Sequence, residues 1–416
     1  MDQRVYTVYD HEIITCVHKT IHTMRDYMDI KKRIDELKEE LVKLRREFHR
    51  IPEIGFEEYK TQEKILEYLN SLELDEVKKI AGTGVVALLK GSKPGKTVML
   101  RSDIDALPVK EETGLPFASE HEGKMHACGH DGHMSMLLVA ARVLSEMKDE
   151  LEGNVKFVFQ PNEEDAGAYK VVEDGVMKNP TVDSVFGMHL WSQVPSGRID
   201  IVEGPQMAAS HYFYLTIKGK GGHAGFAHES IDPIFAATNI VQSVQAVQTR
   251  EIDALNPAVI MFTEFHAGSN MTIVPEKVEI KGSIRFLYEG GEEIFERFER
   301  IIKNTCAAHR VEYELNYKVG NNLLSNDPEV TGYVREVAAE VLGDPAKVTS
   351  KIRTMAGEDF SDYVREVPGA FAFVGINNPK AKSDYPHHHP KFTIDEDVLP
   401  SGVEMHVKIA RKLLSV

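Results

Sequence analysis

The densest group of reactive side chains lies in residues 125–133, with the sequence MHACGHDGH, which opens a predicted helix. Cys128 and His130 are two residues apart, so a thiolate and an imidazole can bind one metal ion from a single turn of backbone. Gly129 between them permits a close approach of the backbone. The alternative is a cysteine packed as a small hydrophobic residue beside solvated histidines. Taken alone, the segment favours metal binding over that alternative.

Two further groups of polar side chains follow predicted strands. Glu163 and Glu164, in the sequence QPNEED, come directly after an apolar run. Adjacent carboxylates at a strand end can divide the chemistry, because one binds a metal ion while the other takes a proton from water. His189 ends the apolar run VFGM. Taken alone, an acidic loop is more often only solvated, and a histidine at a strand end is more often a core residue with satisfied hydrogen bonds.

A loop between two prolines, with the sequence PHHHP at 386–390, presents several imidazoles. Such a cluster has many explanations, and metal binding is one of them. Taken together, one thiolate, carboxylates and imidazoles form a suitable donor set for two borderline cations such as Zn²⁺, Mn²⁺ or Co²⁺. All of them lie at strand ends or in loops, and ligands gather at the carboxyl ends of the strands of an open α/β sheet. The set therefore predicts a site for two divalent metal ions.

The elements that position these side chains follow from the hydrophobic pattern. A helix is predicted to begin at Asp29, and Pro52 ends it. One face of this helix is apolar and consists of Ile34, Leu37, Leu41, Leu44 and Phe48. The GSKPG segment at 91–95 separates two apolar runs and indicates a hairpin or a tight loop. Strands alternating with helices predict an α/β sandwich. Its expected helices are 61–71, 133–147, 328–342 and 399–414, and its strands 84–90, 97–101, 154–160, 182–189 and 370–376.

The middle of the chain has a different order of elements. It reads strand 211–218, helix 231–250, strand 258–266, strand 276–287, helix 291–308 and strand 311–318. This order is the ferredoxin-like βαββαβ unit. We therefore predict an α/β catalytic sandwich with a mixed sheet, interrupted by an inserted smaller domain. The predicted divisions are an N-terminal extension (1–28), the first part of the catalytic domain (29–205), the inserted domain (206–319) and the second part of the catalytic domain (320–416). The extension, with strand-like VYTVYD and ITCV, is interpreted as an edge strand or an oligomer contact.

Composition narrows the possible partners and the compartment. The chain has 416 residues and a net charge of -16, which repels phosphate backbones and anionic lipid, so neither nucleic acid nor a membrane is an expected partner. No apolar run reaches the roughly 20 residues that a membrane span needs, and the first residues, MDQRVYTVYDHE, do not resemble a secretory signal. The cysteines, Cys16, Cys128 and Cys306, are too scattered for a disulfide framework. A cytoplasmic location is therefore expected.

Seven motifs occur in one order along the chain: LRSDIDALP, HACGHDGH, QPNEED, GMHLW, GKGGHAGFAHESIDP, AGEDF and HHPKF. From about residue 30 to residue 416, the chain resembles the amidohydrolases that include aminoacylases, hippurate hydrolases and plant auxin-conjugate hydrolases. These belong to the larger aminoacylase and carboxypeptidase group of two-metal metallopeptidases. The resemblance implies a metal-dependent enzyme that cleaves the amide bond of small N-acyl amino acids with an activated water molecule.

The resemblance also implies roles for individual residues. Five side chains would bind two divalent metal ions: Cys128, His130, Glu164, His189 and His388. Cys128 would bridge the two ions, in the place where sister subfamilies have an aspartate. His388 is preferred over His387 because the ligand in the family stands two residues before the proline. Glu163 would be the general base, and three aspartates would orient the ligands without binding metal: Asp103, Asp105 and Asp131.

The inserted domain supplies the remaining implied site residues. His223 resembles a histidine that reaches the active site, commonly from the partner subunit, and stabilises the developing oxyanion. Here Ala227 precedes His228 where the family often has proline, which leaves His223 in place. Asn270 and Arg285 match polar positions that would hold the substrate carboxylate, although an arginine paired with an acid for structural reasons is an equal alternative.

Three functions are compatible with these residues. The first is an N-acyl amino acid amidohydrolase, and the second is a carboxypeptidase or dipeptidase that performs the same reaction on a different acyl group. The third, a non-catalytic metal-binding protein, is disfavoured because Glu163 stands beside the expected ligand Glu164 and a storage site needs no base. A homodimer or a larger homo-oligomer is expected if His223 acts across an interface.

Overall fold

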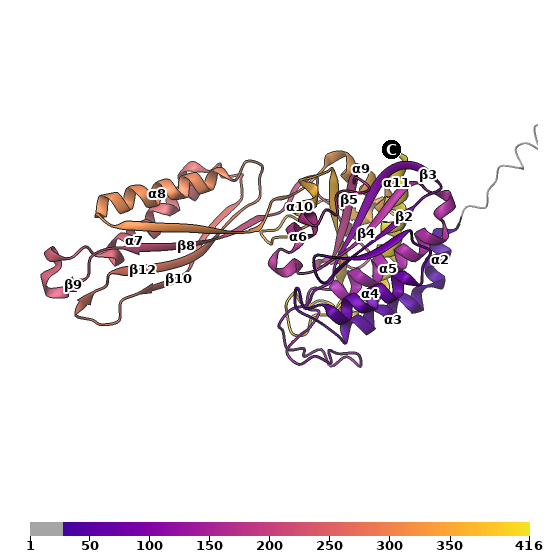
Figure 1. Ribbon diagram of the computed structural model, residues 1–416, viewed down its shortest axis with the longest axis horizontal. Coiled ribbons are helices and arrows are strands. Elements are labelled where there is room, and N and C mark those ends of the chain that lie inside the picture. Colours follow the sequence, from indigo (N-terminus) through magenta and orange to yellow (C-terminus); the bar gives the residue numbers. More distant parts are fainter. Residues whose placement is uncertain (1–27) are drawn as a thin grey trace, which may run out of the picture.

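The structure of the chain is a computed structural model that describes residues 28–416 and consists of two lobes (Figure 1). The larger lobe contains an eight-stranded sheet, and the elongated smaller lobe contains a four-stranded sheet. The predicted N-terminal strands at VYTVYD and ITCV, with Cys16, lie outside the described residues. Within the described part, no helix combines the length and the apolar character that a membrane crossing requires.

The large sheet is mixed, as predicted. Its strands lie in the order β1-β2-β4-β3-β5-β16-β6-β15. The central pairs β4–β3, β3–β5 and β5–β16 are parallel, whereas β1–β2 and β2–β4 are antiparallel. The bounds of the strands are β1 Glu76–Ile80, β2 Gly84–Lys90, β3 Lys93–Asp103, β4 Glu152–Gln160, β5 Ser184–Pro195, β6 Ile199–Asp200, β15 Val348–Thr349 and β16 Gly369–Asn377.

The expected hairpin between β2 and β3 is wrong, and the alternative of a tight loop holds. Strand β4 lies between these two strands and pairs with both of them. The backbone N–H groups of Gly91 and Ser92 donate to the carbonyl oxygens of Gly153 and Leu151, at 2.7 and 2.9 Å. These two hydrogen bonds carry the loop across the start of β4, so β3 enters the sheet on the far side of that strand.

Helices cover both faces of this sheet and create two cores. Neighbouring residues of one strand belong to different cores, as Phe157 and Val158 of β4 do. The predicted apolar face of the first helix is buried, but Leu37 divides that helix into α2 and α3. The main helices are α2 Ile30–Glu36, α3 Lys38–His49, α4 Tyr59–Asn70, α5 His130–Glu146, α6 Ala168–Glu173, α9 Pro328–Leu342, α10 Ser361–Val364 and α11 Leu399–Ser415.

The smaller lobe confirms the ferredoxin-like order of elements. Its antiparallel sheet has the order β10-β12-β8-β13, and α7 and α8 lie on one face of it (Figure 1). Along β8, Phe213, Leu215 and Ile217 are buried, whereas Tyr212 and Tyr214 are exposed on the alternate side. The elements are β8 Ala209–Lys218, α7 Pro233–Ala246, β10 Ala258–Ala267, β12 Lys277–Phe286, α8 Glu293–His309 and β13 Glu312–Asn321.

The smaller lobe is an insertion, because β5 before it and β16 after it pair in parallel in the large sheet. Two short antiparallel pairs mark its ends: β7 Gly204–Met207 with β14 Leu324–Asn326 at the junction of the lobes, and β9 Gly222–His223 with β11 Ile273–Val274 at the tip. The fold class is thus confirmed, while the division of the chain at residues 28, 205 and 319 stays a prediction.

Candidate metal centre

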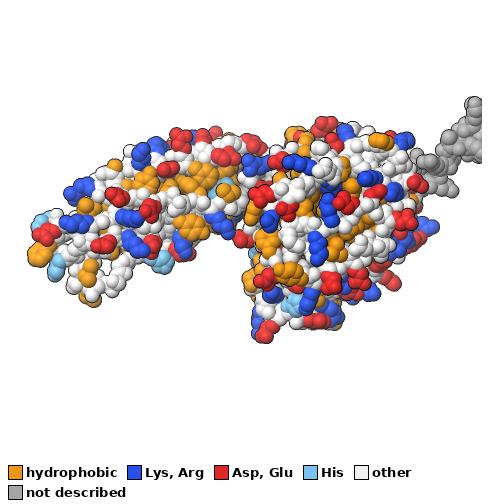
Figure 2. All heavy atoms as spheres, viewed as in Figure 1, with side chains coloured by type: hydrophobic (Ala, Val, Ile, Leu, Met, Phe, Trp, Pro, Cys, Tyr) orange, Lys and Arg blue, Asp and Glu red, His pale blue; other side chains and the backbone are white. Residues whose placement is uncertain are grey.

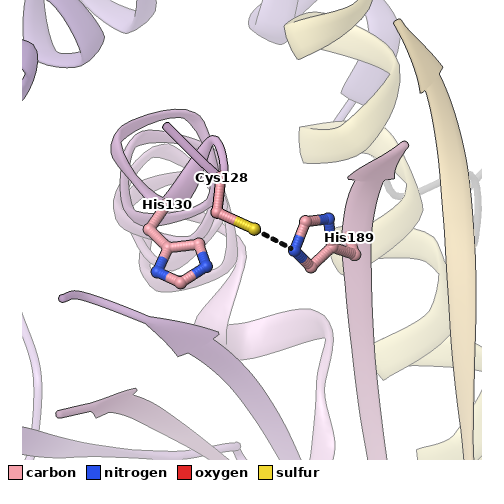
Figure 3. Close-up of side chains that lie close together, drawn as sticks. All are labelled: Cys128, His130 and His189. Atoms are coloured by element: carbon pink, nitrogen blue, oxygen red, sulfur yellow. Dashed lines mark hydrogen bonds between the residues drawn. The ribbon is translucent and has the colours of Figure 1, made fainter. Parts of the chain in front are cut away.

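Side chains from four separate segments meet above the carboxyl ends of β3 and β4. Potential ligand atoms lie within 4.8 Å of one another in three overlapping groups. The groups are Cys128 with His130 and His189, Cys128 with Glu164 and His388, and His130 with Glu163 and Glu164. All five predicted metal ligands are therefore brought together, and Cys128 belongs to two of the groups. Figure 3 shows the first group, with Cys128, His130 and His189 close together.

Local backbone geometry places Cys128 and His130 at the start of α5. Gly129 has a left-handed conformation with φ 93°, which a residue with a Cβ rarely adopts, and it turns the chain into the helix. His189 lies on β5, which extends to Pro195 and therefore does not end at His189 as expected. Strand β3 accompanies β5 only as far as Gly187, so the side chain of His189 stands beyond the end of β3.

Two histidines each direct toward the centre a ring nitrogen that carries no proton. His189 Nδ1 donates to the carbonyl oxygen of Leu190 at 2.8 Å, which leaves Nε2 as the acceptor, 3.4 Å from Cys128 Sγ. His130 Nδ1 donates to the backbone carbonyl of Asp105 at 2.9 Å. Its Nε2 is buried and has no hydrogen-bond partner among the described residues, and the same is true of Glu164 Oε1. Buried polar atoms are normally paired, so these unpaired lone pairs fit a bound cation.

The electrostatics of Cys128 point the same way. Burial, reinforced by the carboxylates of Glu164 and Glu163, raises the pKa of the Cys128 thiol well above its usual range. A thiolate at this place therefore needs a cation to offset its charge. One sulfur, two imidazoles and carboxylate oxygens form the mixed donor set that suits borderline divalent metals. The residues that are present thus fit the two-metal prediction.

His388 and His387 differ in what their rings contact. The backbone N–H of His388 donates to the carbonyl of Ala127 at 2.8 Å, and its Nε2 lies 3.4 Å from Glu164 Oε2. The side chain of His388 is 54% exposed, so it lines the open side of the centre. His387 instead uses both nitrogens, on the Leu190 carbonyl at 2.9 Å and on Ser192 Oγ at 3.0 Å. The geometry therefore favours His388, the predicted choice.

The three predicted orienting aspartates lie in two places. Asp105 accepts from His130 Nδ1 at 3.1 Å and from the backbone N–H of Glu164 at 3.0 Å, so it contacts two of the predicted ligands. Asp103 accepts from His133 Nδ1 at 2.6 Å and lies 3.8 Å from His130 Nδ1.

Asp131 lies apart from the ligands, against Arg45 and His49 at 2.8 Å each. Burial alone raises the pKa of Asp131, but these two neighbours outweigh burial and hold it below its usual range. Asp131 thus fixes the start of α5 against α3 and contacts none of the predicted ligand side chains.

Glu163, the predicted base, is buried beside the ligands. Its Oε2 lies 3.9 Å from His130 Nε2. Burial, followed by the charges of Glu358 and Glu164, raises the pKa of Glu163 well above its usual range. A carboxylate with a raised pKa holds a proton more readily, which suits a group that takes and returns one.

A buried cluster of charged side chains that the sequence did not predict lies behind Glu163. Glu358 and Asp359 place carboxylate oxygens within 4.8 Å of a Glu163 oxygen and of each other. The guanidinium of Arg101 contacts them at 3.1 and 2.9 Å, and it also contacts Asp103 at 2.8 Å. The available signal was Arg101 itself, since a cation inside an apolar strand requires buried partners.

The predicted residues of the inserted domain do not join this centre within one chain. His223 is exposed on β9, at the end of the smaller lobe that points away from the larger one (Figure 1), and its Nδ1 accepts from the N–H of Gly225 at 3.0 Å. Asn270 is also exposed near this tip and accepts from Thr272. Arg285 lies at the base of the lobe and donates to the carbonyl of Met355 at 2.7 Å.

Comparison with known proteins gives a consistent result. Residues 99–412 match the family described as Peptidase family M20/M25/M40. Thermostable carboxypeptidase 1 of Saccharolobus solfataricus is 38% identical over 390 residues, which cover 92% of this chain and 98% of the relative. N-acetylcysteine deacetylase of Bacillus subtilis is 38% identical over 374 residues, which cover 89% and 96%.

A solved structure agrees with these matches. The Bacillus subtilis YXEP protein, described as a dinuclear metal binding peptidase from the M20 family, superposes with a TM-score of 0.80 and 34% identity. The superposition covers 92% of this chain and 99% of that one.

Proposed function

Since the chain belongs to Peptidase family M20/M25/M40, we propose that its site hydrolyses the amide bond of N-acyl amino acids and releases the free amino acid. The chain is a metal-dependent hydrolase. The observation that carries the proposal is the meeting of one thiol, three imidazoles and one carboxylate from four segments, with a further buried carboxylate, Glu163, beside them. Relatives named N-acetylcysteine deacetylase and N-acyl-L-amino acid amidohydrolase, 38% and 40% identical, support the substrate class.

Two divalent cations, with Zn²⁺, Mn²⁺ and Co²⁺ as candidates, would be held by the five predicted ligands: Cys128, His130, Glu164, His189 and His388. The chemistry that such cations supply when bound is Lewis acidity, which acidifies water and polarises an amide carbonyl. Asp105 keeps His130 and Glu164 in place through its two carboxylate oxygens. Asp103 holds His133, whose Nε2 accepts from the backbone N–H of Leu190 at 2.9 Å, next to His189.

Glu163 carries the proton in this proposal. It takes a proton from the attacking water at Oε2 as the C–O bond forms and the carbonyl oxygen becomes an oxyanion. It then returns the proton to the leaving nitrogen, and the amide C–N bond breaks as the carbonyl re-forms. The buried position of Glu163 excludes bulk water and favours proton return. Asn270 and Arg285 are proposed to hold the substrate carboxylate once a second copy or a movement of the lobe brings them near.

His223 is proposed to act from a second copy of the chain, as the donor that stabilises the oxyanion, an effect worth ~3–4 kcal/mol. Its exposed position on the tip of the smaller lobe supports this role, because that lobe also exposes hydrophobic side chains such as Tyr212, Met261 and Met271. Figure 2 shows hydrophobic side chains on the surface of this lobe. We therefore propose a homodimer or a larger homo-oligomer.

A mixing experiment tests this arrangement. His223→Ala and Glu163→Gln proteins are each expected to be inactive. If His223 acts across the interface, dissociating and reassociating them together restores about a quarter of wild-type activity, because half of the dimers are mixed and each mixed dimer has one intact site. No recovery from verified mixed dimers would place His223 within its own chain or outside the reaction.

A second candidate function is a carboxypeptidase or dipeptidase, which the match to thermostable carboxypeptidases 1 and 2, at 38% and 37% identity, favours. The test is a panel of N-acetyl amino acids, N-benzoyl amino acids, dipeptides and longer peptides. The protein is reconstituted in turn with Zn²⁺, Mn²⁺, Co²⁺ and Ni²⁺. Preference for N-acyl amino acids supports the first proposal, whereas preference for peptides supports the second. Hydrolysis of neither class would refute both.

The compartment is proposed from cysteine chemistry. Cys128 and Cys306 are free and buried. A metal-binding thiol must stay reduced, and the cytoplasm maintains that state. We therefore propose a cytoplasmic location.

A further inference from the structure

The loop that carries Glu163 and Glu164 is held in an unusual conformation. Between the end of β4 and the start of α6, Asn162 and Ala166 both adopt left-handed backbone angles, with φ 56° and 58°. Such conformations are costly for residues other than glycine and persist only when their surroundings fix them. Inside the loop, Gly167 N–H donates to the Asn162 carbonyl at 2.7 Å, but that bond cannot fix the loop relative to the sheet.

Three buried carboxylates restrain the loop from outside. Glu58 and Asp105 each accept from one backbone N–H within it, at Asn162 and Glu164, whereas Asp359 holds both of its ends. Asp359 accepts hydrogen bonds from the residue before the loop and from the residue after it. Gln160 Nε2 donates to both Asp359 oxygens, at 2.9 and 2.7 Å, and the backbone N–H of Ala168 donates to Oδ2 at 2.8 Å. Asp359 is only 1% exposed, so water does not compete for these bonds. The two ends of the loop are thus tied to one side chain.

The same carboxylate is connected to the histidine side of the metal centre. Arg101 Nη2 donates to Asp359 Oδ1 at 2.9 Å, while Nη1 donates to Asp103 at 2.8 Å. Asp103 in turn accepts from His133 at 2.6 Å, near the start of α5. A chain of buried charge-assisted bonds therefore runs from the loop of the base to the helix that carries His130.

We propose that Asp359 is a positioning residue that clamps the loop of Glu163 and Glu164 in register with the metal ligands on α5 and β5. The proposal rests on the proposed hydrolase function for its kinetic part. In this proposal, a residue of the segment after the inserted domain sets the distance between the base and the cations. A displacement of about 1 Å can cost a factor of about 100 in rate, so such a clamp matters for turnover.

The test compares Asp359→Asn with a matched control. Every group that contacts the Asp359 carboxylate donates a hydrogen bond to it. In either orientation of the asparagine side chain, its amide nitrogen, which is itself a donor, faces an N–H group, so hydrogen bonds are lost. The control is Asp362→Asn in the next helical turn, where Asp362 accepts from Asn322 at 2.6 Å and has no hydrogen bond to the loop. If Asp359→Asn fails to fold, Gln160→Met removes the two side-chain bonds to Asp359 from the other partner.

Two measurements are made on each variant. Amide hydrogen exchange of residues 161–168 is followed in metal-free protein, and kcat and KM are measured at saturating metal. We expect Asp359→Asn and Gln160→Met to exchange faster in this segment but not in α8, and to lose about 10–100-fold in kcat with little change in KM. Asp362→Asn should match the wild type in both measurements.

The outcomes separate the clamp from the proposed function. Wild-type exchange in 161–168, or wild-type kcat, in a folded Asp359→Asn or Gln160→Met protein would overturn the clamp. A general loss of protection that includes α8 would also overturn it, because it indicates a role in overall stability alone. If the wild type hydrolyses no amide, the proposed function fails, and the exchange comparison still decides whether Asp359 holds the loop.

Discussion

Replacing Glu58 by glutamine should stabilise the protein above neutral pH. Glu58 is fully buried beside the loop of the metal centre. One of its oxygens accepts from the backbone N–H of Asn162 at 3.0 Å, and the other accepts from the hydroxyl of Thr83. A glutamine keeps both contacts, since its oxygen accepts from Asn162 and its amide group donates to the Thr83 hydroxyl. The substitution therefore removes a charge and little else.

The magnitude follows from the pKa of this carboxyl. Burial, partly opposed by the Thr83 bond and reinforced by the charge of Asp105, raises the pKa of Glu58 from 4.5 to about 7. Between these values the folded protein holds a proton that the unfolded chain has released, so the wild type loses stability as pH rises. With about 1.36 kcal/mol per pKa unit, the cost is about 3 kcal/mol at pH 8 and about 1 kcal/mol at pH 5.5.

Thermal melting of metal-loaded Glu58→Gln at these two pH values measures the effect. The entropy of unfolding, about 2.1 cal/mol/K per residue, gives roughly 1 °C per kcal/mol for 416 residues. The melting temperature should therefore exceed that of the wild type by roughly 3 °C at pH 8 and by roughly 1 °C at pH 5.5. Glu57→Gln is the control, because it changes the net charge equally at a side chain that is 65% exposed. A gain that is absent at pH 8, or that does not change with pH, would refute the reasoning.

Three other predictions concern the metal centre. Glu163→Gln should keep both metal ions by elemental analysis and lose about 10²–10⁴-fold in kcat, and near-normal turnover would exclude Glu163 as the base. Cys128→Ala should bind metal more weakly at both positions in titrations, because its sulfur belongs to two ligand groups; loss at neither position would contradict that sharing. His388→Ala should weaken metal binding more than His387→Ala does, and the reverse order would make His387 the ligand.

The sequence predicts those features that depend on local pattern. The apolar face with Leu41, Leu44 and Phe48 is buried because spacing along a helix determines which residues share a face. The βαββαβ order of the smaller lobe follows in the same way from alternating and helical periodicities. The clustering of the five ligand candidates follows from the resemblance and from their positions at strand ends and loops, where an open sheet gathers its ligands.

Features that depend on distant partners were missed. The bond between Arg101 and Asp359 joins residues 258 positions apart. An arginine inside an apolar strand indicates that buried partners exist, but nothing near Arg101 indicates which residues they are. The insertion of β4 between β2 and β3 is accompanied by a backbone bond from Gly91 to Gly153, which lies at the start of β4 and far along the chain. A loop of suitable length between two apolar runs permits a hairpin but does not determine which strands pair.

Backbone geometry favours His388 over His387 as the predicted ligand. His388 has φ 65°, and its N–H bond to Ala127 turns the ring toward Glu164. Three consecutive histidines give no sign of which one adopts such a conformation. In the proposed dimer, the position of His223 relative to the centre depends on a second chain, which neither the sequence nor one folded chain determines.

The most direct test is anomalous X-ray diffraction from crystals of the metal-loaded protein, measured at the absorption edge of the cation. The account predicts two peaks close to each other, with Cys128 Sγ beside both. The remaining predicted ligands should surround them: His130, Glu164, His189 and His388. A single peak, peaks away from Cys128, or no peak in a fully active protein would contradict the two-metal centre.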